Sequence, residues 1–167
     1  MSIAETLLPE FEQEMKSTRT LLERVPDAKA QWKPHPKSFA LGHLAQLVSW
    51  MPGWIGQTLK HPALDLGKAG SYSFETTATL LQGFDAGVRE SAAALKAAKD
   101  ADFAAPWSLK KGDQVFFTLP KGVVIRQHIS HLAHHRGQLT VYLRLLDVPI
   151  PQIYGPTADD RGFLAGH

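Results

Sequence analysis

The stretch His131-Leu132-Ala133-His134-His135-Arg136-Gly137-Gln138 carries three of the eight histidines of this 167-residue chain. On a helix, residues four apart lie one turn apart on the same face, so His131 and His135 can direct their imidazoles to one point. His128, one turn before His131, lies close to that face. Two imidazoles at this spacing can chelate one metal ion. The alternative interpretation is an interfacial helix whose histidines are solvated or hydrogen-bonded.

The composition limits the chemistry open to the chain. It contains no cysteine, which excludes disulfides and thiol nucleophiles and leaves histidine and carboxylate as metal ligands. The formal charge of +2 is spread along the chain, and no basic run exceeds Lys110-Lys111, so nucleic acid is not an expected partner. No signal peptide and no membrane-spanning apolar run is recognisable. We therefore expect a cytoplasmic protein with one domain over residues 1–167.

Hydrophobic periodicity predicts four long helices, over about residues 2–25, 39–60, 73–100 and 121–146. Pro9 indicates that the regular part of the first helix begins near that residue, and Pro52 predicts a kink or break in the second. Residues 61–72 are typical of a loop. Residues 101–120 predict a short hairpin, with an extended loop as the alternative. Four long helices with one small insertion predict an all-α four-helix bundle.

Two stripes of residues run along the second predicted helix. The first is apolar and is predicted to face the core: Leu44, Val48, Met51 and Ile55. The second lies on the adjoining flank: His43, Leu47, Trp50 and Trp54, whose tryptophans can wall a pocket.

A stripe on the fourth predicted helix places three histidines among apolar residues, in the order Val124, His128, His131, His135, Leu139, Tyr142 and Leu146. An unpaired buried imidazole costs about 1–3 kcal/mol, so this pattern predicts a shared polar site, which a metal ion would satisfy. His43, on the facing helix, is the candidate third ligand. Three histidines would leave a coordination position open for water or substrate.

Two longer stretches are similar to a known family: HLAHHRGQLTVYLRLLDVPIPQIYGP (131–156) and SFALGHLAQLVSWMPGW (38–54). Together they resemble the DinB family of metal-binding four-helix bundles, and the core His135 to Gln138 is the most specific part. The resemblance implies an up-down-down-up bundle, a homodimer, and a divalent ion such as zinc or nickel. The better-understood relatives in this family are thiol-dependent transferases that use low-molecular-weight thiols, or metal-dependent hydrolases, and most members have no assigned reaction.

Carried over by position, two family ligands fall on His131 and His135, whereas the third falls on Leu47. His43 lies one turn earlier on the same stripe, about 6 Å along the helix axis. Three interpretations stay open: His43 substitutes with a shift of the site, the metal binds weakly, or this branch of the family has lost it. If the two helices are antiparallel, such a shift favours His135 over His131 and takes the site away from His128.

Two residues that follow the ligand pair have structural roles in our interpretation. Arg136 is predicted to pair with a carboxylate at a helix or dimer interface, and Gln138 to support a ligand. A general base is not evident; Asp113, Asp159 and Asp160 are available, and nothing in the sequence selects one.

The sequence thus predicts a DinB-like protein that binds a divalent metal and acts as a metal-dependent hydrolase or thiol-dependent transferase on a small molecule. The alternative is a non-catalytic, dimeric helical-bundle module for binding or stress response, with a degenerate metal site.

Overall fold

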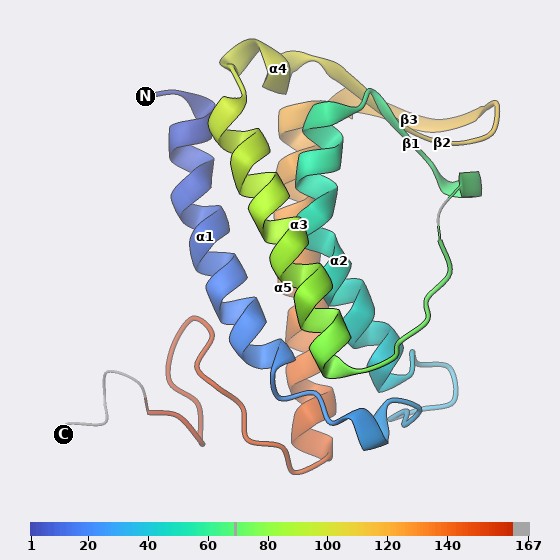
Figure 1. The fold of residues 1–167 in the computed structure, drawn as a ribbon, viewed down its shortest axis with the longest axis vertical. Coiled ribbons are helices and arrows are strands. Elements are labelled where there is room, and N and C mark those ends of the chain that lie inside the picture. Colours follow the sequence, from blue (N-terminus) through green and yellow to red (C-terminus); the bar gives the residue numbers. More distant parts are fainter. Residues whose placement is uncertain (69, 162–167) are drawn as a thin grey trace.

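The computed structural model describes residues 1–68 and 70–161 and is mostly helical, with one small sheet. The long helices are α1 (Ile3–Leu22), α2 (Leu41–Lys60), α3 (Thr77–Ala97) and α5 (Lys121–Leu145). The short helical elements are η1 (Asp27–Lys29), η2 (Leu66–Lys68) and α4 (Asp100–Ala104). The strands are β1 (Ala63–Asp65), β2 (Pro106–Lys111) and β3 (Gln114–Pro120). In Figure 1, α1 and α5 run downwards, whereas α2 and α3 run upwards.

The core lies between the four long helices. Helix α2 packs against both α3 and α5, and α1 packs mainly against α3. The predicted apolar stripe of α2 is buried, as expected: Leu44, Val48, Met51 and Ile55. The predicted core stripe of α5 is wrong in part, because the core is formed by Ile125, Ile129, Leu132, Leu139 and Leu143. His131 is exposed and His128 half-buried, while His135 is buried at the edge of the core.

Helix α1 begins before Pro9, not near it as predicted. The Ser2 hydroxyl accepts from the Glu5 amide at 3.2 Å, and the Glu5 carboxylate accepts from the Ser2 amide at 2.7 Å. This capping box satisfies amides that have no partner within the helix, and it fixes the helix start. The helix continues through Pro9, whose missing amide costs one hydrogen bond near the N-terminal end.

Helix α2 is continuous through Pro52, where the sequence predicted a kink or break. The hydroxyl of Ser91 on α3 donates to the Pro52 carbonyl at 2.7 Å and accepts from the Gly56 amide at 2.9 Å. A side chain of the neighbouring helix thus enters the hydrogen-bond ladder of α2 at this point. Ser91 thus bridges the Pro52 carbonyl and the Gly56 amide, in the turn that follows the proline.

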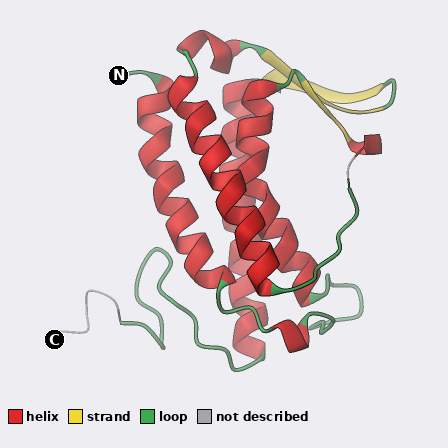
Figure 2. Ribbon diagram, in the orientation of Figure 1, coloured by secondary structure: helices red, strands yellow, loops and turns green. Residues whose placement is uncertain are grey.

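The small sheet has the strand order β1-β2-β3 and covers one end of α2 and α5 (Figure 2). The predicted hairpin is confirmed as the antiparallel pair β2–β3, whose turn contains Gly112 with a φ of 59°. Strand β1 lies where a loop was expected, and it pairs with β2 in parallel. The Asp65 carboxylate accepts from the Gly67 and Gly112 amides at 2.9 and 3.1 Å, which ties β1 to the hairpin turn.

Within the described ranges, no helix is long and apolar enough to cross a membrane.

Candidate functional site

A cavity of about 790 Å³ lies between α2, α5, the sheet and the segment that follows β1. We call it the aromatic pocket; its lining residues are Trp50, Trp54, Leu64, Leu66, Gly70, Tyr72, Trp107, Leu109, Phe117, Val124, Gln127, His128 and His131. Cavities that bind small molecules commonly have this size and this apolar character. The prediction that Trp50 and Trp54 wall a pocket is therefore confirmed.

His131 and His135 form a close pair beside this cavity. Their Nε2 atoms are 2.9 Å apart, and His131 lines the pocket. The Gln138 carboxamide contacts His135 Nδ1 through Oε1 at 2.7 Å and His134 Nε2 through its nitrogen at 3.1 Å. Because an amide oxygen only accepts, His135 Nδ1 must carry a hydrogen, and the lone pair of neutral His135 then lies on Nε2, towards His131. Gln138 thus contacts His135, one of the two predicted ligands of this helix.

The surroundings of the two pocket histidines favour their neutral forms. Burial, followed by the nearby charge of protonated His131, lowers the pKa of His128 to about 4. The Nε2 atom of His128 is hydrogen-bonded to the buried Thr58 hydroxyl at 3.2 Å. The pKa of His131 is also lowered, first by partial burial and then by the neighbouring His135 and His134. Neutral imidazoles keep a lone pair available to a metal ion or to a hydrogen-bond donor.

His43 lies among aromatic rings and not beside the His131–His135 pair. Its ring stacks between Phe39, at 4.4 Å between centroids, and Tyr72, at 3.9 Å, and Tyr72 in turn stacks on Trp50. Partial burial, followed by the charge of Lys33, lowers the pKa of His43.

No group of three His, Cys, Asp or Glu residues is arranged to hold a metal ion in the described part of the chain. The structure therefore brings together two of the three predicted ligands, His131 and His135, and Leu47 is buried in the core. Two converging imidazole nitrogens fit a divalent ion, but the three-histidine arrangement with His43 is not formed.

Arg136 confirms the prediction of a buried ion pair at a helix interface. Its guanidinium pairs with the Glu14 carboxylate of α1 and donates to Thr18 Oγ1 at 3.0 Å. It also donates to the hydroxyl of Tyr154 at 2.6 Å, which fastens the C-terminal segment to α1 and α5. These contacts are structural, because Arg136 does not line the aromatic pocket.

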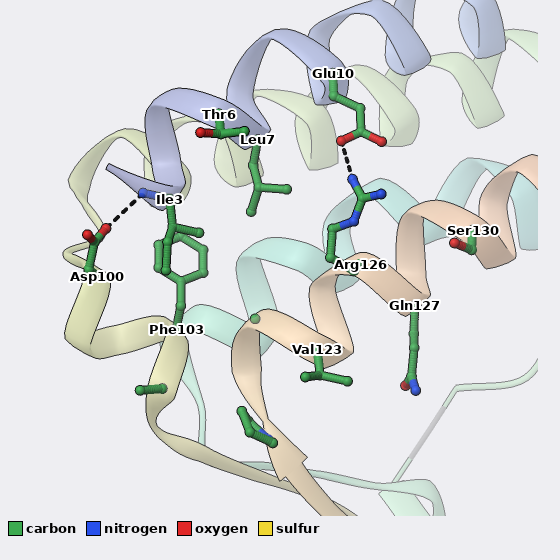
Figure 3. A pocket seen from close by; sticks show the side chains of 13 residues that line it. Ile3, Thr6, Leu7, Glu10, Asp100, Phe103, Val123, Arg126, Gln127 and Ser130 are labelled. Carbon is green, nitrogen blue, oxygen red and sulfur yellow. Dashed lines mark hydrogen bonds and ion pairs between the residues drawn. The ribbon is translucent and has the colours of Figure 1, made fainter. Parts of the chain in front are cut away.

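A second cavity, of about 1020 Å³, lies where α1, α4 and the N-terminal half of α5 meet (Figure 3). Its charged groups already have partners: Arg126 pairs with Glu10, and the Asp100 carboxylate accepts from the Ile3 amide. No histidine lines it among the residues described. We therefore place the candidate site in the smaller aromatic pocket.

Three aromatic residues of the pocket were missed by sequence reasoning: Tyr72, Trp107 and Phe117. They lie in the two connecting segments, 61–76 and 100–120, which the parallel pairing of β1 with β2 brings together. The aromatic residues of these segments were visible in the sequence, but periodicity cannot place a loop against a helix.

The fold and site define a class of protein: a mostly helical chain with a histidine pair at the edge of an aromatic pocket. The model of the DinB family matches residues 1–161, and the chain belongs to the DinB family.

Two crystal structures share the fold. One is a DinB-like protein from Bacillus cereus ATCC 10987, with a TM-score of 0.71 and 22% identity over 92% of this chain and 98% of that one. The other is a DinB-like protein, YjoA, from Bacillus subtilis, with a TM-score of 0.70 and 15% identity over 93% of this chain and 99% of that one. The uncharacterized protein YrdA of Bacillus subtilis (strain 168) is 40% identical over 42 residues, a quarter of either chain.

Proposed function

We propose that this DinB-family protein, built as an up-down-down-up four-helix bundle, binds a small organic molecule in the aromatic pocket and a divalent metal ion at the His131–His135 pair. The observation that carries the proposal is the 2.9 Å approach of the two Nε2 atoms beside the cavity. In a tetrahedral zinc site with bonds of 2.0–2.1 Å, ligand nitrogens lie about 3.3 Å apart. A small rotation of the rings would therefore admit the ion in place of the shared hydrogen.

A bound divalent ion would supply a Lewis acid that lowers the pKa of a water or thiol. Catalytic zinc sites generally use three protein ligands, whereas this pair supplies two. The buried Leu47 at the third family position favours a binding module with a degenerate metal site over a hydrolase or thiol transferase. In that module, Gln138 holds the tautomer of His135 and the aromatic walls exclude water from the ligand.

Metal titration of untagged protein tests the pair. We expect zinc or nickel to bind at a ratio of one ion per chain, and His131→Gln to weaken the affinity by at least about tenfold. His131 is exposed, so this change should leave the fold intact. The matched control is His35→Gln, the same change at an exposed histidine of the segment between α1 and α2, which should bind as tightly as wild type. Equal affinity in wild type and His131→Gln would exclude the two-histidine site.

The same titration decides the predicted role of His43 as third ligand. Because its ring stacks between Phe39 and Tyr72, we expect His43→Ala to retain the affinity for metal. A tenfold loss would instead show that His43 joins the site when the ion is present.

We also propose that the protein is a homodimer. The proposal rests on the family resemblance and on the outer face of α5, where Val123, Val141 and Leu145 are 44%, 58% and 58% exposed. Val141 and Leu145 lie one turn apart, and neighbouring exposed apolar side chains are typical of a contact with another chain.

A further inference from the structure

We propose that the ligand of the aromatic pocket is an uncharged molecule with a flat aromatic body. This inference rests on the proposed small-molecule function and adds the chemical class of the ligand. It follows from three properties of the lining: its charge, the geometry of its rings and the position of its few polar groups.

The lining offers no counter-charge to a ligand. Among the described residues that line the pocket, none is Asp, Glu, Lys or Arg. Its polar groups are the side chains of Gln127, His128 and His131, the Tyr72 hydroxyl and the indole N–H groups of the tryptophans. A buried charge without a partner is strongly unfavourable, and the imidazole nitrogens and the Gln127 amide are suited to neutral hydrogen bonds. A cation would gain attraction from the ring faces, but the lining has no carboxylate to pair with it.

The rings form two walls of different geometry. On one wall, Trp50 and Tyr72 stack with centroids 4.8 Å apart and planes inclined by 17°. On the other wall, the Trp107 ring is nearly perpendicular to His128, with 6.4 Å between the ring centroids. The centroid of Phe117 lies 6.2 Å from that of Trp107, and these two rings are tilted. Aromatic rings attract one another in offset-stacked and edge-to-face arrangements. Because Tyr72 is covered on both faces, by His43 and by Trp50, a flat ring would stack on the second face of Trp50 while its edge meets the other wall. A saturated ring of the same size has no such face.

The imidazole and amide groups of the lining lie on one side of the cavity. Gln127, His128 and His131 all belong to α5, whereas the stacked wall belongs to α2 and the segment after β1. The Nε2 atom of His128 is already hydrogen-bonded to Thr58, and that of His131 to His135. Gln127 is exposed, and no hydrogen bond of its side chain to the described residues is formed, so it is the nearest free partner for a single hydroxyl or carbonyl group of a ligand.

The test is a series of four probes built on the same bicyclic carbon skeleton. They are 2-naphthol (neutral), 2-naphthoate (anionic), 2-naphthyltrimethylammonium (cationic) and decahydro-2-naphthol (neutral but saturated). Each is titrated calorimetrically into the full chain at neutral pH with a chelator present. We expect 2-naphthol to bind at least about tenfold more tightly than each of the other three. Equal or tighter binding of either ion, equal binding of the saturated alcohol, or no binding of 2-naphthol would overturn the inference.

Substitutions at two neighbouring phenylalanines of β3 test whether the probe binds in the pocket. Phe117 lines the pocket, whereas Phe116 does not, and the two are 38% and 48% exposed. We expect Phe117→Ala to weaken 2-naphthol binding at least about fivefold and Phe116→Ala to leave it unchanged. If both changes weaken binding equally, the probe binds elsewhere on the hairpin and the assignment to the pocket is wrong.

The outcome is separable from that of the metal proposal, because the probes are titrated without metal. Loss of metal binding in every protein, with the naphthol preference intact, would remove the metal site and leave the ligand class. A failed probe series with normal metal binding would do the reverse.

Discussion

Among single residues, Arg136 is the most completely enclosed charge of the described chain. Its side chain is 1% exposed, and it donates to the Glu14 carboxylate, to the Glu14 backbone oxygen at 3.0 Å and to two hydroxyls. Each buried charge of such a pair depends on the other, because removal of one leaves the other without compensation.

We predict that Arg136→Ala lowers the free energy of unfolding by about 3–5 kcal/mol, because it leaves the Glu14 carboxylate buried and unpaired. Urea denaturation followed by circular dichroism measures the change. The matched control is Arg126→Ala, which removes another arginine of α5 from another glutamate of α1, Glu10, but at an exposed position. An exposed pair contributes about 0–1 kcal/mol, so similar losses in the two variants would contradict the burial argument.

The half-buried His128 should make stability depend on pH. Its pKa is about 4 in the folded chain and about 6.5 when unfolded. Below pH 6.5 the unfolded chain therefore binds a proton that the folded chain does not, and stability falls as the pH falls towards 4. The contribution of this histidine is at most roughly 3 kcal/mol across that range.

Urea denaturation at several pH values between about 4 and 7 tests this prediction for wild type and His128→Gln. Glutamine does not titrate and can still hydrogen-bond to Thr58. We expect the variant to lose less stability than wild type as the pH falls. Parallel curves would mean that His128 titrates normally in the folded protein.

Among the helices and strands, those defined by a local sequence pattern were predictable, whereas the strand that depends on long-range pairing was not. The four long helices were predictable because each repeats its apolar residues over five or more turns. Strand β1 has three residues and was not predictable, because only its parallel pairing with β2 makes it a strand. The start of α1 was misplaced because Pro9 was given more weight than the capping residues Ser2 and Glu5.

The crossing of α2 and α3 offers a prediction at this scale. The Ser91 hydroxyl is hydrogen-bonded to both the Pro52 carbonyl and the Gly56 amide. The helices are close here, since a Cβ atom on Gly56 would lie 2.9 Å from the Ser91 hydroxyl oxygen. We predict that Ser91→Ala destabilises the fold by about 1–3 kcal/mol, since two buried backbone groups lose their partner. Thermal unfolding measures this.

The control for the crossing is Ser130→Ala, at an exposed position of α5, which should change stability by less than about 0.5 kcal/mol. A loss equally small in Ser91→Ala would show that the Gly56 amide bonds directly to the Pro52 carbonyl once the hydroxyl is gone.

At the scale of the whole molecule, the candidate site forms only when segments far apart in the sequence are folded together. The histidine pair was predictable because i and i+4 residues of a helix meet whatever surrounds them. The stacked position of His43 was not, because it depends on Tyr72, a residue of a connecting segment 29 positions away in the sequence. The pocket likewise needs Trp107 and Phe117 from a third segment.

Assembly with a second copy gives the last prediction. Val123 and Val141 are 18 residues apart, which is five helical turns, so they lie on the same side of α5. Val123 is 44% exposed and Val141 is 58% exposed. We predict that the wild-type protein has twice the 18.4 kDa mass of one chain in light scattering coupled to size exclusion, and that Val141→Glu reduces it to one. A charge introduced at the centre of an apolar contact is desolvated without a partner in both copies of a two-fold dimer. The control is Val115→Glu, which adds the same charge at a 54% exposed valine of β3 and should leave the dimer intact. A monomeric wild type, or dissociation by Val115→Glu alone, would remove α5 as the interface.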